Sequence, residues 1–122
     1  MAFAFDNGFI NHFYLRDVLS TRLQNVIDRY DFPSQVFIDS CNDGMCSTKL
    51  IYMTSGMAVE LFLDWDRDAE GDVTVTPDSE VKGIEFFAPG EKGYLTAYPQ
   101  YSQSFPRWSS PWVGYTKYSF RR

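Results

Sequence analysis

Residues 58–65 constrain the fold of this chain most, because their side chains alternate in character along the chain. The odd-numbered positions are Val59, Leu61, Leu63 and Trp65, whereas the even-numbered ones include Glu60 and other residues of mixed character. Successive side chains of a β-strand point to opposite faces of its sheet, so this pattern predicts a strand with one face in the core. The even-numbered face, Glu60 included, is expected to point outward.

Six further short runs are rich in β-forming residues and separated by turn residues, which is typical of strands. They cover residues 36–39, 49–54, 72–76, 84–87, 94–98 and 113–120. The connections between them are short, so consecutive strands are expected to pair as antiparallel hairpins. No second helical pattern is present that would support parallel crossovers.

One amphipathic helix is predicted over residues 11–30, where apolar side chains recur at spacings of three and four. Asn11 or Asn7 is expected to cap it, and Pro33 prevents its continuation. The predicted fold class is therefore α+β, with one N-terminal amphipathic helix packed on a mainly antiparallel, meandering β-sheet of about five to seven strands.

The length of 122 residues favours a single α+β domain over residues 1–122. Hydrophobic residues make up 44% of the chain, enough apolar material for a core. No apolar run approaches the length of a membrane span, and the first residues lack the basic and apolar regions of a secretion signal. A cytoplasmic location without membrane contact is the resulting expectation.

The net charge of −5 disfavours direct binding to nucleic acid or to an anionic membrane. Residues 64–85 hold eight acids against two bases, a balance of −6, whereas residues 86–122 hold one acid against five bases, a balance of +4. The chain thus has an acidic segment and a basic C-terminal part. The alternative is that these charges are simply solvated or neutralise one another in the fold.

Cys41 and Cys46 flank an Asp43-Gly44 pair that is typical of a two-residue hairpin turn, which would place the cysteines directly opposite each other. That geometry permits a disulfide. The expected cytoplasmic location favours two reduced, packed thiols, with a disulfide as the alternative.

The first half of a calcium loop is visible at residues 66–72, with Asp66, Asp68, Glu70 and Gly71 at its first, third, fifth and sixth positions. Pro77 replaces the glutamate that such loops need at the twelfth position. A charged hairpin tip with Gly71 at positive φ is favoured over this weak calcium-binding alternative, and no metal or cofactor is expected.

No catalytic constellation is visible. His12 is the only histidine, no nucleophile elbow is present, and only Glu60 and Glu85 lie within apolar strand patterns where burial would perturb a carboxyl group. A second candidate surface combines a cation with flat aromatic side chains near the C-terminus. It consists of Phe105, Arg107, Trp108 and Trp112.

The favoured interpretation is a small, acidic, non-enzymatic protein-binding domain, such as an inhibitor, immunity or adaptor protein. It would occlude a basic surface of a macromolecular partner, possibly a nucleic-acid-binding protein, through residues 64–85. The expected partner-binding residues are Asp64, Asp66, Asp68, Glu70, Asp72, Asp78 and Glu80. The alternative is a ligand-binding module that uses the aromatic loop around Trp108 and Trp112.

Overall fold

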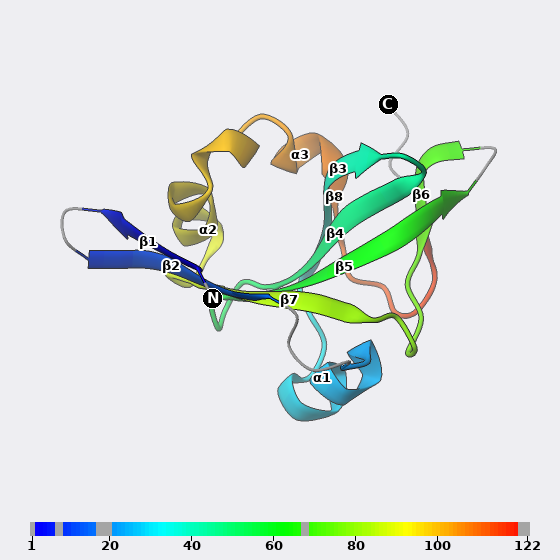
Figure 1. Ribbon diagram of the computed structural model, residues 1–122, viewed down its shortest axis with the longest axis horizontal. Helices are drawn as coiled ribbons and strands as arrows, with labels where there is room; N and C mark the ends of the chain where they lie inside the picture. Colours follow the sequence, from blue (N-terminus) through cyan, green and yellow to red (C-terminus); the bar gives the residue numbers. More distant parts are fainter. Residues whose placement is uncertain (1, 7–8, 17–20, 67–68, 120–122) are drawn as a thin grey trace.

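A curved antiparallel sheet forms the middle layer of the protein, and helices lie on both of its faces (Figure 1). The computed structural model describes residues 2–6, 9–16, 21–66 and 69–119, with side chains described within 21–64 and 72–119. The strands in these ranges are β1 (Ala2–Asp6), β2 (Phe9–Arg16), β3 (Gln35–Asn42), β4 (Met45–Tyr52), β5 (Met57–Asp66), β6 (Ala69–Thr74), β7 (Val81–Phe87), β8 (Ser109–Pro111) and β9 (Lys117–Ser119). The helices are α1 (Leu23–Tyr30), α2 (Glu91–Ala97), the 3₁₀ turn η1 (Pro99–Tyr101) and α3 (Phe105–Trp108).

The strands follow the order β1-β2-β7-β5-β4-β3-β8, and β6 extends the sheet by pairing with both β5 and β9. The pairs among the described residues are antiparallel. The β1–β2 hairpin and the β5–β6 hairpin lie at opposite ends of the molecule (Figure 1). The antiparallel sheet and the α+β class predicted from the sequence are confirmed, with more strands than expected.

Each face of the sheet carries its own hydrophobic core. On the α1 side, Leu23, Val26 and Ile27 of the helix pack against the odd-numbered residues of β5 and their neighbours on β3 and β4. On the other side, the aromatic cluster covered by α2, η1 and α3 is built around Phe37 and Tyr94. The two cores are called the α1-side core and the α2-side core below.

The predicted helix over residues 11–30 is only partly correct. Residues 23–30 form α1, but residues 11–16 belong to β2, and residues 17–20 lie outside the described residues. The periodicity of residues 11–16 fits a strand as well as a helix, and pairing of β2 with both β1 and β7 selects the strand. The first N–H groups of α1 are satisfied by backbone, since Leu23 donates to the carbonyl of Ser79 and Gln24 to that of Pro77.

The predicted strand over residues 94–98 is wrong, because Glu91–Ala97 forms helix α2. Tyrosine has a high propensity for β-strands. Here the ring of Tyr94 is fully buried in the α2-side core, and this tertiary packing overrides the local preference for a strand. Gly93 permits this arrangement, since a Cβ at that position would lie 1.8 Å from the carbonyl oxygen of Ala88. In the predicted run 113–120, only Lys117–Ser119 is a strand, and Phe120 lies outside the described residues.

Burial of both faces corrects a second expectation. The even-numbered side chains of β5 do not all point to solvent, because α2, η1 and α3 cover part of their face and leave Ala58 and Glu60 buried. The alternation of an apolar and a mixed face predicts a half-exposed strand, but the helical layer that covers the mixed face is not visible in the pattern of the strand itself. Among the described residues, no helix is both long and apolar enough to cross a membrane.

Candidate functional site

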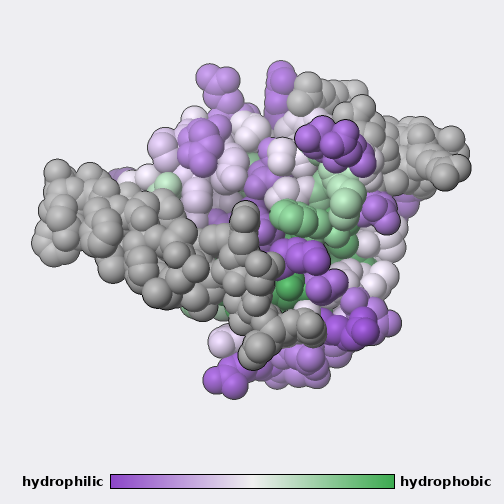
Figure 2. All heavy atoms as spheres, viewed as in Figure 1, coloured by the Kyte–Doolittle hydropathy of each residue, from purple (hydrophilic) through white to green (hydrophobic). Residues whose placement is uncertain are grey.

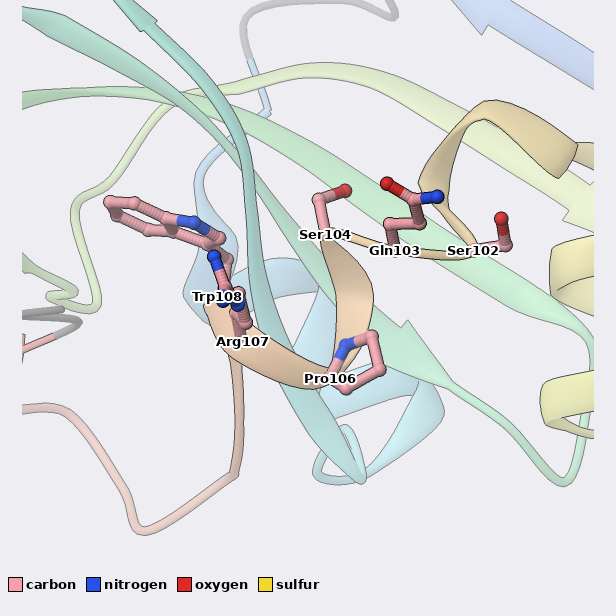
Figure 3. Close-up of a pocket in the computed structure, with 6 residues that line it drawn as sticks. All are labelled: Ser102, Gln103, Ser104, Pro106, Arg107 and Trp108. Carbon is pink, nitrogen blue, oxygen red and sulfur yellow. The ribbon is translucent and has the colours of Figure 1, made fainter.

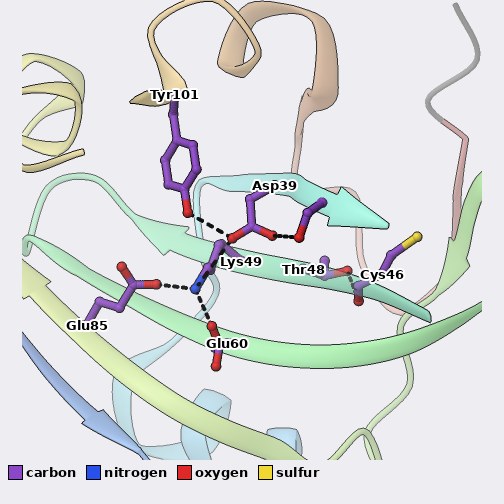
Figure 4. A network of polar contacts seen from close by, with 8 residues as sticks. Asp39, Cys46, Thr48, Lys49, Glu60, Glu85 and Tyr101 are labelled. Carbon is purple, nitrogen blue, oxygen red and sulfur yellow. Dashed lines mark hydrogen bonds and ion pairs between the residues drawn. The ribbon is translucent and has the colours of Figure 1, made fainter. Parts of the chain in front are cut away.

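A cluster of charged side chains lies buried on the α2-side face of the sheet (Figure 4). Lys49 of β4 stands directly opposite Glu60 of β5, and its Nζ lies 2.5 Å from Glu60 Oε2. Glu85 of β7 brings Oε1 to the same distance of 2.5 Å, and Asp39 of β3 places Oδ2 at 3.7 Å. One ammonium group thus lies among three carboxylates drawn from three other strands.

These side chains are almost completely removed from water: Lys49 is 4% exposed and Glu85 is 2% exposed. Burial by itself lowers the pKa of Lys49, but the negative charges of Glu85, Glu60 and Asp39 outweigh this and raise the pKa above its usual range. Lys49 is therefore the cationic partner of these carboxylates. It is not a free amine available as a nucleophile.

The charged cluster also connects the sheet to the helical layer. The hydroxyl of Tyr101, on η1, donates a hydrogen bond of 3.0 Å to Asp39 Oδ2. Burial raises the pKa of Tyr101, and the charge of Asp39 adds to the effect. We conclude that the cluster positions η1 over β3, a structural role that sequence reasoning did not identify.

A small groove opens on the same face of the sheet, beyond the helical layer. Its cavity of about 210 Å³ is lined by Ser40, Asn42, Met45, Ser47 and Phe62, and it is called the β3–β5 groove below. Met45 and Phe62 are 43% and 42% exposed, which is unusual for large apolar side chains that are neighbours. Figure 2 shows hydrophobic side chains gathered over β4 and β5.

The acidic residues expected to form one binding surface are distributed over several environments. Asp64 is exposed, and its Cα pairs with that of Met45 at the end of the β3–β5 groove. Asp72 is 1% exposed and pairs with Lys117 of β9 at 3.6 Å, so it lies in the interior and not on a surface. This ion pair joins the acidic segment to the basic C-terminal part.

Two of the other acidic residues predicted to bind a partner have cationic neighbours within the protein. Asp78 is exposed but lies 3.9 Å from Arg22, and Glu80 lies 3.4 Å from Lys82. The side chains of Asp66 and Glu70 and all of Asp68 lie outside the described residues. By contrast, Asp43 at the β3–β4 turn is exposed and has no cationic partner among the described residues.

The calcium-like segment forms part of the β5–β6 hairpin, as the favoured interpretation predicted. Gly71, however, lies within β6 and not at the tip. Within the ranges that the structure describes, no three His, Cys, Asp or Glu side chains are arranged to hold a metal ion.

The predicted aromatic surface is mostly packed into the protein. Phe105 is 3% exposed, with its ring centroid 5.0 Å from that of Phe37 in the α2-side core. Trp112 is half-buried and stacks on Tyr118 with a centroid distance of 6.1 Å. Trp108 is half-buried against both cores, so neither tryptophan is an exposed platform.

Arg107 is the exposed member of that group, and it contributes to a shallow hollow in the loop around α3 (Figure 3). The hollow has a volume of about 570 Å³ and is lined by Ser102, Gln103, Ser104, Pro106, Arg107 and Trp108. In Figure 3 the Trp108 ring points away from the side chains of Ser102 and Gln103. Hydroxyl, amide and guanidinium groups make this a polar surface.

The cysteines are opposed across the β3–β4 hairpin, as the turn signal predicted, but they form a disulfide and are not two thiols. Asp43 and Gly44 have φ of 53° and 80°, the left-handed values that a type I′ turn requires. The expectation of reduced cysteines rested on location and not on geometry, and the geometry brings the two sulfur atoms together.

Sequence reasoning singled out Glu60 and Glu85 but missed Lys49, Asp39 and Met45. A charge in the middle of an apolar strand, such as Lys49 just before Leu50, is the available signal for a buried ion pair. No such signal exists for the β3–β5 groove, which depends on where the helical layer ends.

No family model, no curated protein and no solved structure matches this chain. The function proposed for it therefore depends on the geometry and charge of its own surface.

Proposed function

We propose that this protein is a non-enzymatic protein-binding domain whose acidic end opposes a basic surface of another macromolecule, in the manner of an inhibitor or adaptor. One observation carries the proposal: Asp43 and Asp64 are exposed at the open end of the β3–β4–β5 strands without a cationic partner among the described residues. The overall charge of −5 adds long-range attraction to a basic partner.

The proposed binding surface is smaller than the acidic segment expected from the sequence. Asp72 is buried, and Asp78 and Glu80 have cationic neighbours. Binding is therefore assigned to Asp43 and Asp64 together with the adjoining β5–β6 hairpin. Single exposed ion pairs contribute only about 0 to 1 kcal/mol, so the effect of these charges is collective and acts mainly on the association rate.

The test is a charge reversal followed by kinetics. The variant Asp43→Lys with Asp64→Lys is compared with a control, Asp28→Lys with Glu91→Lys, which reverses two exposed acids on α1 and α2. Proteins captured from the native host are then measured for association rate at low and moderate salt. We expect slower association for the first variant and a native complex that weakens with salt.

An equal effect of the two double variants would argue that only net charge matters, and an absence of any salt dependence would contradict the proposal. Either result would show that the acidic end is not the binding surface. All four positions are exposed, but Asp43 has φ of 53°, so Lys at this position weakens the turn. Circular dichroism verifies that the fold of both variants remains intact before binding is compared.

A second candidate function is binding of a small polar ligand in the hollow around Arg107, favoured by its volume of about 570 Å³. This volume falls within the roughly 300–1,000 Å³ typical of ligand sites. Arg107→Ala should then abolish binding in a screen of anionic and carbohydrate ligands followed by tryptophan fluorescence. A flat fluorescence response of the native protein to the whole screen would eliminate this candidate.

A further inference from the structure

The β3–β5 groove combines an apolar floor with an acidic rim. Met45 and Phe62 line it and are each more than two fifths exposed, while Ser40, Asn42 and Ser47 complete its lining. Asp64 follows Phe62 by two residues on the same face of β5, and Asp43 follows Asn42 at the adjacent turn. An apolar patch rimmed by charge is typical of an interaction site.

The framework of the groove is held in place from the opposite face of the sheet. Cys41 and Cys46 alternate with the groove residues along β3 and β4, and their disulfide joins the two strands. Cys46 is fully buried in the α1-side core. The backbone that carries Met45 is thus cross-linked and anchored, and a pre-organised site loses little conformational entropy on binding.

The size of the groove limits what it can accept. Its volume of about 210 Å³ is below the roughly 300–1,000 Å³ of sites that enclose a whole small molecule. One side chain is a better match, and the exposed rings and methyl groups of Phe62 and Met45 call for an apolar one. The carboxylates of Asp43 and Asp64 favour Lys or Arg on either side of it.

We infer that the β3–β5 groove receives a single apolar anchor side chain from a Lys- and Arg-rich segment of the protein partner. This inference rests on the proposed function, since it specifies how the basic partner is held once charge has brought it near. A second copy of this chain is disfavoured as the occupant, because two acidic rims in a protein of net charge −5 would repel each other.

The experiment uses two matched sets of short synthetic peptides, all rich in Lys and Arg. The central residue is Leu, Met or Phe in one set and Ser in the other. Binding to the native protein, to Phe62→Ala, to Met45→Ala and to Asp43→Lys with Asp64→Lys is measured by fluorescence anisotropy at two salt concentrations. Phe32→Ala is the matched control, because Phe32 is 60% exposed and precedes the opposite end of β3.

We expect the apolar set to bind at least about tenfold more tightly than the Ser set, through slower dissociation. Phe62→Ala and Met45→Ala should remove this preference, whereas Phe32→Ala should retain it. Equal binding of the two sets, weakened by charge reversal and by salt, would overturn the groove inference and leave the proposed acidic surface in place.

Two other results separate the ideas further. A preference for the apolar set that depends on Phe62 but not on salt or on Asp43 and Asp64 would contradict the proposed function. Concentration-dependent dimers in analytical ultracentrifugation, abolished by Phe62→Ala, would assign the groove to a second copy of the chain and overturn the inference.

Discussion

At the scale of single residues, Lys49 is the charge on which the interior depends most. Its ammonium group is the cation placed among Glu60, Glu85 and Asp39, so three buried carboxylates share it. A buried ion pair adds little net stability compared with an apolar replacement of the whole set, but removal of one partner leaves the others uncompensated. The cluster is therefore sensitive to loss of its cation.

Lys49→Met should lower the free energy of unfolding by about 3–5 kcal/mol, because it leaves buried negative charge without a cationic partner. Urea titrations monitored by circular dichroism measure this loss, with the exposed Lys92→Met as a control that should change little. Adding Glu60→Gln and Glu85→Gln to Lys49→Met should restore part of the stability. If Lys49→Met alone were as stable as the native protein, the ion pairs of Lys49 would not contribute to stability in the way proposed.

Alkaline pH should destabilise the protein. Burial, with a contribution from Glu85, raises the pKa of Tyr94 above its ordinary value near 10, and the carboxylates raise that of Lys49 in spite of its burial. Above about pH 10 the unfolded chain therefore releases protons that the native state keeps, so it binds fewer protons and stability falls as pH rises. Urea titrations between about pH 9 and pH 11 should show this decline, and a flat profile would contradict it.

Tyr94→Phe separates the tyrosine contribution from that of the lysine. The Tyr94 hydroxyl is buried and has no hydrogen-bond partner among the described residues, so its removal at neutral pH should leave stability unchanged or raise it by about 1–3 kcal/mol. At alkaline pH the variant should lose less stability than the native protein. An equal alkaline loss in both proteins would assign the effect to Lys49, Tyr52 and Tyr101.

At the scale of elements, the turn between β4 and β5 is the connection with the strictest backbone requirement. Gly56 has φ of 73°, and a Cβ there would lie 2.3 Å from the carbonyl oxygen of Phe87. Its own N–H and C=O bond to Tyr52 and Phe87. The turn thus docks on the end of β7, where the chain enters the helical layer.

Gly56→Ala should destabilise the protein by about 1–3 kcal/mol, because it combines an unfavourable φ with a backbone clash. Gly44→Ala is an informative comparison, since Gly44 also has positive φ but open space around its Cα. Thermal unfolding of both variants should give the larger decrease in Tm for Gly56→Ala. A smaller decrease than for Gly44→Ala would mean that the β4–β5 turn relaxes without resistance from Phe87.

The disulfide in the β3–β4 hairpin should stabilise the protein modestly. The disulfide joins residues separated by 5 positions, so the closed loop is short and the chain-entropy estimate of its stabilisation is about 2 kcal/mol. Cys41→Ala with Cys46→Ala should lower stability by about this amount and leave the fold intact, since the antiparallel register of β3, β4 and β5 does not depend on the bond. Urea titration with and without reductant measures the loss, and no response to reductant would contradict the disulfide.

At the scale of the whole molecule, the sheet shares its strands between the two cores. Phe37 and Ile51 face the α2-side core, while their neighbours Val36 and Leu50 face the α1-side core. If one core unfolds, the strands that it shares with the other core are exposed to solvent, and the other core loses its packing. The two layers should therefore unfold together.

Phe105→Ala tests this coupling, because Phe105 is 3% exposed and lies far along the chain from α1. The substitution should cost about 3–5 kcal/mol and shift far-ultraviolet circular dichroism and tryptophan fluorescence to the same lower midpoint. Two separate transitions would show that the α2-side layer unfolds on its own, and the protein would then consist of two cooperative units.

How much the sequence determined varies with the range of the interactions involved. Alternation along residues 58–65, the Asp43-Gly44 turn and the apolar stripe of residues 23–30 are local signals, and β5, the β3–β4 hairpin and α1 follow from them. The α+β class and the antiparallel pairing depend on the same local patterns. The opposed cysteines, too, could be predicted from the turn alone.

Only the tertiary structure decided the rest, because those features depend on contacts between distant segments. Residues 11–16 become a strand through pairing with β7, and residues 94–97 become helical while Tyr94 packs on Phe37 and Phe87. The helical layer buries Glu60, and beyond its edge Phe62 and Met45 remain open as the β3–β5 groove. A strand pattern records how side chains alternate along one segment, but what covers each face is determined by other segments of the chain, here α1 on one face and α2, η1 and α3 on the other.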